Sequence, residues 1–194
     1  MSLRRRVDGL LAIVAALCVT GLMGVQTAAS SAPSADVWVR VDTGSEITEV
    51  WRGDERLLRL DDIAFGRGGI SDLHLKGDQT TPRGEYRITH VNEESRFHRF
   101  IGINYPTLDH LDRARQRGAL TESQYRAMLD DGLRDGRFPQ DGILGGYIGF
   151  HGIGDGDPDI HAAFHWTEGC IAMTNAQIET LQSLVGVGTP VVVE

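Results

Sequence analysis

The sequence predicts a mostly β fold (β-rich α+β) with a few helices at its periphery. Three observations support this fold class. Apolar and polar residues alternate along the first half of the chain after residue 34, helix-start signals occur only in the second half, and 24 glycines provide many turns. Residues 35–194 are enough chain for one domain with its own core.

Three strands open the predicted domain as a meander. Valines at alternate positions from residue 37 to residue 41 are typical of a half-buried strand, and short turns containing glycine separate it from two further strands. The three predicted strands cover residues 37–41, 47–51 and 56–60.

Two more strands follow a glycine-rich connection. The proline and glycine of Thr81-Pro82-Arg83-Gly84 fix a turn ahead of an alternating strand over residues 85–91. Residues 100–105 are predicted to form the next strand.

Helical signals begin after these strands. Thr121 and Gln124 form a capping box that starts a surface helix, and a shorter helical segment over residues 108–114 precedes it. Residues 132–146, rich in Gly, Asp and Pro, predict a long loop that leads to an apolar strand over residues 147–151.

The C-terminal part repeats the helix-then-strand pattern. Thr174 and Gln177 form a second capping box, and Gly186 and Gly188 end the helix that it starts. A closing strand is predicted over residues 191–193.

The N-terminal segment has the pattern of an export signal. Arg4, Arg5 and Arg6 precede an apolar run over residues 9–25 and a small, polar stretch over residues 26–34. This pattern predicts a signal peptide, or an uncleaved membrane anchor, and places the protein in the periplasm or cell envelope. The predicted boundaries are 1–34 for this segment and 35–194 for the domain.

The chain is acidic, and this disfavours a nucleic-acid partner. Its formal net charge is −8, and residues 1–32 contribute three arginines and one aspartate, so without them the charge is −10. Binding to phosphates requires clustered Lys and Arg, whereas Lys76 is the only lysine of the chain.

Cys170 is the cysteine on which the chemistry is expected to depend, since the other cysteine, Cys18, lies in the N-terminal segment. A solitary thiol has no intramolecular disulfide partner, and its position beside a glycine and downstream of Phe150-His151-Gly152 indicates a nucleophile. An ordinary thiol is only slightly ionised at neutral pH, so we expect His151 to act as base during attack and as acid toward the leaving amine. An inert buried cysteine is the alternative interpretation.

The residues around Cys170 suggest the rest of a catalytic site. Gly169 lets substrate approach the backbone, so the N–H groups of Gly169 and Cys170 are candidates for an oxyanion hole; an ordinary tight turn is the alternative. Thr167 is expected to cap the cysteine loop or to contact substrate, and Trp166 to form a wall of the groove or to pack in the core. Arg83 is a candidate ligand for a carboxylate.

Metal binding is a weaker interpretation, and no metal or other cofactor is expected. His161 and His165, together with Cys170 and His151, have residue types that bind zinc. The run of aspartates from Asp155 to Asp159 lacks the turn glycine and the bidentate glutamate of a calcium loop. These aspartates are expected to be loop carboxylates.

The histidine and cysteine motifs together resemble a known family. Phe150-His151-Gly152 followed by Thr167-x-Gly169-Cys170-Ile171 is similar to the signature of the L,D-transpeptidase (YkuD-type) catalytic domain. Further similarity is found in Thr81-Pro82-x-Gly84-x-Tyr86, in residues 97–106 and in Gly188-Thr189-Pro190-Val191-Val192. The resemblance extends from Val37 to the C-terminus.

The resemblance implies a mixed β-sandwich with peripheral helices. It also implies that a backbone carbonyl, here that of Gly152, orients His151.

Two positions depart from the common signature, because Glu168 replaces a histidine and Ala172 replaces an arginine. The form of the cysteine motif is similar to that of a periplasmic branch of YafK-like proteins, some of which cleave murein-linked amides.

The leading functional hypothesis is a cell-wall acyltransferase. The resemblance implies attack of Cys170 on a peptidoglycan stem peptide, a thioester, and transfer of the acyl group to an amine of another stem, a murein-linked lipoprotein or a free D-amino acid. One alternative is an amide hydrolase that uses the same residues with water as acceptor. A wall-binding module without catalytic activity is the other.

Overall fold

The computed structural model describes residues 37–194. The predicted signal or anchor over residues 1–34, including Cys18, lies outside the described residues and remains a prediction. No helix within residues 37–194 combines the length and the hydropathy that a membrane span requires.

Most strands belong to one eight-stranded mixed sheet with the order β3-β2-β1-β10-β6-β7-β8-β9. Their bounds in chain order are β1 Val37–Asp42, β2 Ile47–Arg52, β3 Glu55–Leu60, β6 Gly84–Ser95, β7 His98–Ile103, β8 Gly149–His151, β9 Ile171–Ala172 and β10 Pro190–Val193. A separate parallel pair consists of β4 (Ile70–Ser71) and β5 (Thr81–Pro82).

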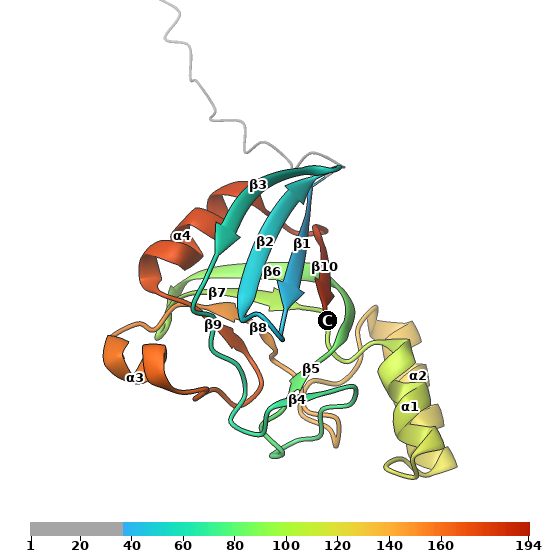
Figure 1. Ribbon diagram of the computed structural model, residues 1–194. Helices are drawn as coiled ribbons and strands as arrows, with labels where there is room; N and C mark the ends of the chain where they lie inside the picture. Colours follow the sequence, from blue (N-terminus) through green and yellow to red (C-terminus); the bar gives the residue numbers. More distant parts are fainter. Residues whose placement is uncertain (1–36) are drawn as a thin grey trace, which may run out of the picture. The chain divides into compact units, whose positions relative to one another are not determined.

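Strand β6 connects the two halves of the sheet. Its first residues, from Gly84 to Arg87, pair with β10, and the part from Ile88 to Ser95 pairs with β7. Figure 1 shows the consequence: β1, β2, β3 and β10 lie side by side, with β2 antiparallel to β1 and β3, and β6 and β7 cross behind them. The predicted mixed β-sandwich with peripheral helices is therefore confirmed.

The main core fills the space between these two halves. Residues of β1 and β10 alternate between buried and half-buried positions, as expected for a strand with one covered face, and the valines of β1 take its buried positions. Largest among the fully buried side chains are Phe65, Tyr105 and Phe150. Helix α4 (Asn175–Leu184) adds Ile178 and Leu181 to this core.

A smaller core holds the helical hairpin of α1 (Leu108–Gln116) and α2 (Glu122–Asp135) against the 73–75 and 138–144 segments. Figure 1 shows this hairpin at one end of the molecule, away from β1 to β3. The capping boxes predicted at Thr121 and Thr174 are present and start α2 and α4.

Three local features differ from the sequence predictions. Helix α2 continues through Gly132, because this glycine packs against the ring of Phe138 in the smaller core. Strand β8 begins at Gly149 rather than at Tyr147, whose φ of +56° interrupts an extended strand. The short helix α3 (Pro158–Ala163) occupies the expected aspartate loop, with Asp157 as its N-cap.

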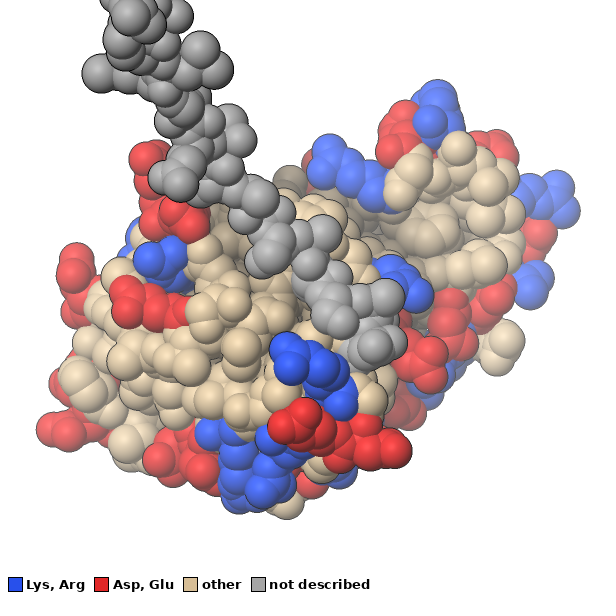
Figure 2. Space-filling model, turned by 90° about the horizontal axis from the view of Figure 1, so that it is seen from above, with Lys and Arg blue, Asp and Glu red and all other residues tan. Residues whose placement is uncertain are grey.

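Charged side chains of both signs cover the surface. On the face shown in Figure 2, acidic and basic residues are interspersed rather than segregated into one broad basic area. On this face of residues 37–194, the interspersed charges give no broad positive potential of the kind that recruits nucleic acid.

Candidate active site

The candidate site is a groove of about 860 Å³ that both His151 and Cys170 line. Other groups from several elements share its wall. They include Arg67, His74, Arg96, Phe97, Tyr147, Trp166, Thr167 and Glu168.

Strand pairing brings the segments of the histidine and the cysteine together. β8 and β9 are parallel, with His151 opposite Ala172. Cys170 comes directly before β9, two positions before Ala172. Both side chains line the same groove.

His151 is almost fully enclosed, at 2% exposure, and its ring is fixed on several sides. Phe97 stacks on it with ring centroids 4.3 Å apart, and Trp166 stands edge-on at 5.5 Å. Burial lowers the pKa of His151 to about 4, although the carbonyl of Gly152 opposes this shift. The imidazole is therefore neutral at physiological pH.

The Nδ1 atom of His151 lies 2.7 Å from the carbonyl oxygen of Gly152. This contact assigns the proton to Nδ1, so Nε2 has the lone pair that accepts a proton. The segment that follows is held firmly, because the side-chain amide of Asn175 bonds both the N–H and the C=O of Gly154 at 2.9 Å. Asn175 is a positioning residue that the sequence analysis missed.

Cys170 is half-buried at the groove, and its thiol donates to the carbonyl oxygen of Tyr147 at 3.5 Å. Protein atoms surround the sulfur densely enough that burial raises the pKa of Cys170 to about 11. A backbone hydrogen bond from Gly149 opposes this shift, and the charge of Glu168 adds to it.

These shifts change the expected resting state of the pair. The sequence predicts a thiolate stabilised by imidazole, but burial acts against both charged forms, since it raises the thiol pKa and lowers the imidazole pKa. In the free protein both groups of the groove, the thiol and the imidazole, are therefore neutral. In such a site the proton leaves sulfur during attack rather than before it.

Thr167 organises the loop that carries the cysteine. Its hydroxyl donates to the carbonyl of Cys170 at 2.7 Å and accepts from the N–H of Gly169 at 3.1 Å. Gly169 has φ +126°, and a Cβ atom there would lie 2.7 Å from the carbonyl oxygen of Thr80, so only glycine fits. Because Thr167 occupies the Gly169 N–H, the N–H of Cys170 is the better placed oxyanion donor of the two.

Two further predicted residues lie in different positions relative to the groove. Trp166 forms part of its wall, and its indole N–H donates to Nδ1 of His161 at 3.2 Å. Arg83 is exposed and is not among the groove residues, whereas Arg67 and Arg96 are. Arg67 forms an ion pair with Glu168 at 3.5 Å.

The two histidines that were candidate zinc ligands, His161 and His165, contact different partners. His161 bonds Trp166, and His165 faces Glu46 at 3.5 Å and the N–H of Phe65 at 3.2 Å. Among residues 37–194, no group of three or more His, Cys, Asp and Glu side chains is arranged to hold a metal ion.

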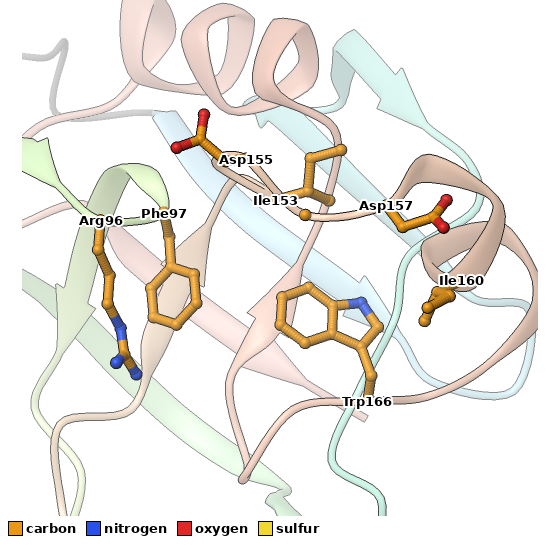
Figure 3. A pocket seen from close by; sticks show the side chains of 8 residues that line it. Arg96, Phe97, Ile153, Asp155, Asp157, Ile160 and Trp166 are labelled. Atoms are coloured by element: carbon orange, nitrogen blue, oxygen red, sulfur yellow. The ribbon is translucent and has the colours of Figure 1, made fainter.

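Phe97 and Trp166 also border a second cavity of about 400 Å³. Figure 3 shows their rings pointing toward one another, with Ile153 and Ile160 nearby. The two rings that enclose His151 therefore stand between the groove and an apolar space, which accounts for the dry surroundings of the imidazole.

A protein-family model identifies the family of this domain. The model of the YkuD L,D-transpeptidase catalytic domain matches residues 36–193. The chain belongs to the L,D-transpeptidase catalytic domain family.

Two solved structures illustrate the likeness of fold. The helical cell shape determining protein Pgp2 of Campylobacter jejuni has a TM-score of 0.55 at 21% identity, over 81% of this chain and 47% of its own. Bd1075 of Bdellovibrio bacteriovorus has a TM-score of 0.51 at 16% identity, over 82% and 48%. No curated protein matches the chain.

The L,D-transpeptidase domain described here thus spans about half the length of these two structures. At these identities the likeness shows a shared fold. Assignment to the YafK-like branch remains a prediction from the cysteine motif.

Several residues of this L,D-transpeptidase site could not be predicted from local patterns. Phe97 and His74 are distant in sequence from the two motifs, and only chain folding brings them to the groove. Tyr147 lies just before the histidine motif, but nothing in the sequence indicated that its carbonyl accepts from the Cys170 thiol. The Gly, Asp and Pro content of residues 132–146 predicted a loop that leads to the strand of His151. It did not indicate which residues of that loop line the groove.

Proposed function

We propose that this protein is a cell-envelope acyltransferase that acts on peptidoglycan stem peptides through a thioester at Cys170. The shared groove of His151 and Cys170, whose segments are joined by the pairing of β8 and β9, supports this proposal more than any other observation. Membership in the L,D-transpeptidase catalytic domain family names the substrate class.

Acylation begins from the neutral pair. Nε2 of His151 takes the thiol proton while sulfur attacks the amide carbon, which forms the C–S bond and a tetrahedral oxyanion. The N–H of Cys170 stabilises that oxyanion. The imidazolium then gives its proton to the leaving amine as the C–N bond breaks, and a thioester remains on Cys170.

The carbonyl of Gly152 keeps His151 in the productive tautomer throughout this step. A backbone carbonyl orients the ring without adding a full negative charge, so the imidazole stays neutral between turnovers. The site therefore works without an acidic third member.

The acceptor decides the product. An amine of another stem, or of a murein-linked lipoprotein, gives a new amide, whereas water releases the acid and makes the protein an amide hydrolase. Both routes break the C–S bond and restore the thiol. The proposed location is the periplasm or cell envelope, where the substrate lies.

Digestion of purified muropeptides tests the proposal. The wild-type chain and Cys170→Ala are incubated with disaccharide tetrapeptides, with and without an added D-amino acid, and the products are analysed by mass spectrometry. Dimers or exchanged stems show transfer, and shortened stems show hydrolysis. Both must disappear in Cys170→Ala.

A non-catalytic wall-binding module is the second candidate, because the resting thiol is neutral and Glu168 replaces the family histidine. It predicts binding to sacculi with no change in muropeptide masses in either sample. That result would overturn the acyltransferase proposal.

A further inference from the structure

A second imidazole reaches the groove from a different part of the chain. His74 lies in the segment between β4 and β5, is 4% exposed, and lines the groove that holds Cys170. Its Cε1 would lie 3.3 Å from a Cβ atom on Gly169, the residue before the nucleophile. His74 is therefore close to the cysteine loop and is not used by the acylation mechanism.

Asp78 and Thr80 fix the orientation of this ring. Nδ1 of His74 lies 2.7 Å from the carbonyl oxygen of Thr80 and 2.9 Å from Oδ1 of Asp78. Because both neighbours are acceptors, Nδ1 holds the proton and Nε2 has the free lone pair. Tyr105 anchors the backbone, since its hydroxyl donates to the carbonyl of His74 at 2.6 Å.

The carboxylate of Asp78 is itself held in place. Its two oxygens accept from the N–H groups of Leu75 at 2.7 Å and Thr80 at 2.9 Å. A carboxylate behind an imidazole stabilises the cation that forms when Nε2 takes a proton. This is the arrangement of a base and the residue that orients it.

Nε2 of His74 is open to the groove. It has no hydrogen-bond partner within residues 37–194 and is not enclosed. Gly145, with φ +66°, leaves room for it, since a Cβ atom there would lie 2.8 Å from Nε2. Glycine at position 145 therefore lets the ring lie at the wall of the groove, where its Nε2 lone pair has no donor among the described residues.

We propose that His74 is a second base that serves the acceptor in the deacylation step, while His151 serves the thiol. The inference rests on the proposed thioester function. As the acceptor amine or water attacks the thioester carbon, Nε2 of His74 takes one of its protons, a C–N or C–O bond forms, and the C–S bond breaks. The proton is then returned to the Cys170 sulfur through the solvent of the groove.

Two substitutions of His74 distinguish a role as a base from a purely structural role. In His74→Asn the amide nitrogen replaces the Nδ1 donor toward Thr80 and Asp78, but no atom replaces Nε2. His74→Gln places an amide near the Nε2 position instead. His98→Asn is the matched control, since His98 pairs with Glu179 and does not line the groove.

The experiment follows the acyl-enzyme by rapid quench and intact-protein mass spectrometry, with a disaccharide tetrapeptide as substrate. Acylation rates of His74→Asn and His74→Gln are expected within threefold of wild type, and decay of the adduct is expected to slow about a hundredfold. The adduct should accumulate in both variants, and His98→Asn should match wild type.

Three outcomes would overturn the inference. If the adduct decays as fast in both variants as in wild type, the role of His74 as a base is rejected, while the thioester function stands. Acylation and decay that fall together with the melting temperature indicate a structural role. A wild-type chain that forms neither adduct nor product rejects the proposed function and this inference with it.

Discussion

The candidate site has a part built on strands and a part built on loops, and the two are held differently. His151 and Cys170 lie on or beside the paired strands β8 and β9, so the backbone ladder sets their relative position. His74, Tyr147 and Glu168 come from connecting segments, and their contacts in the site involve side chains: His74 with Asp78, the Cys170 thiol with the carbonyl of Tyr147, and Glu168 with Arg67. The strands thus fix the segments of the proposed reacting pair, and the loop residue Glu168 adds to the raised pKa of Cys170.

Loss of the strand-borne base should have the largest effect. His151→Gln removes the group that takes the thiol proton, so muropeptide turnover is expected to fall about a thousandfold. His98→Gln, an exposed histidine paired with Glu179, should leave turnover unchanged. If His151→Gln kept a tenth of the wild-type rate, the strand-borne pair would not be the catalytic one.

A methyl group in the cysteine loop should have the next largest effect. Gly169→Ala is expected to lower turnover about a hundredfold and stability by about 2 kcal/mol, because the new Cβ meets Thr80 and the φ is strained. Turnover assays and denaturant unfolding measure both. Gly53→Ala has a positive φ with no neighbouring atom, so it should lower only stability.

Acid should destabilise the folded chain through His151. Its pKa is about 4 in the fold against an ordinary 6.5, so as pH falls from 6.5 the unfolded chain takes up a proton that the folded chain refuses. The unfolding free energy of wild type relative to His151→Gln should therefore decrease by about 2 kcal/mol between pH 7 and pH 5. A constant difference would show that the imidazole is not enclosed.

The loop-borne carboxylate should have the smallest effect. Glu168→Gln removes a charge that raises the pKa of Cys170, so iodoacetamide labelling at pH 8 should accelerate about threefold. Glu94→Gln, also at the groove, is the control and should label like wild type. Equal acceleration in both variants would point to a general charge effect rather than to one loop residue.

Patterns that are local in sequence predicted much of this molecule. Alternating valines predicted β1, and the Thr-x-x-Gln boxes at residues 121 and 174 predicted the starts of α2 and α4, because these signals depend on neighbouring residues. The cysteine and histidine motifs indicated the reacting pair for the same reason.

Features that depend on the folded chain were not predictable in this way. The two-residue strand β9 forms only because β8 is present beside it, and α3 has too few residues to give a clear periodic pattern. The raised pKa of Cys170 and the lowered pKa of His151 come from burial among residues distant in sequence. Sequence motifs indicated which groups are the candidates to react but not their resting charge.

The burial of the Cys170 thiol has a consequence for its oxidation. The thiolate is the form that attacks peroxides and disulfides, and raising the thiol pKa from 9.0 to about 11 reduces that form about a hundredfold near neutral pH. The sulfur is thus kept in its least oxidisable form; in the proposed mechanism it loses its proton to His151 only as it attacks the substrate carbonyl. Cys170 is the one free cysteine of residues 37–194, and no second cysteine there can form a disulfide with it. The burial that disfavours its ionisation therefore also protects it from oxidation.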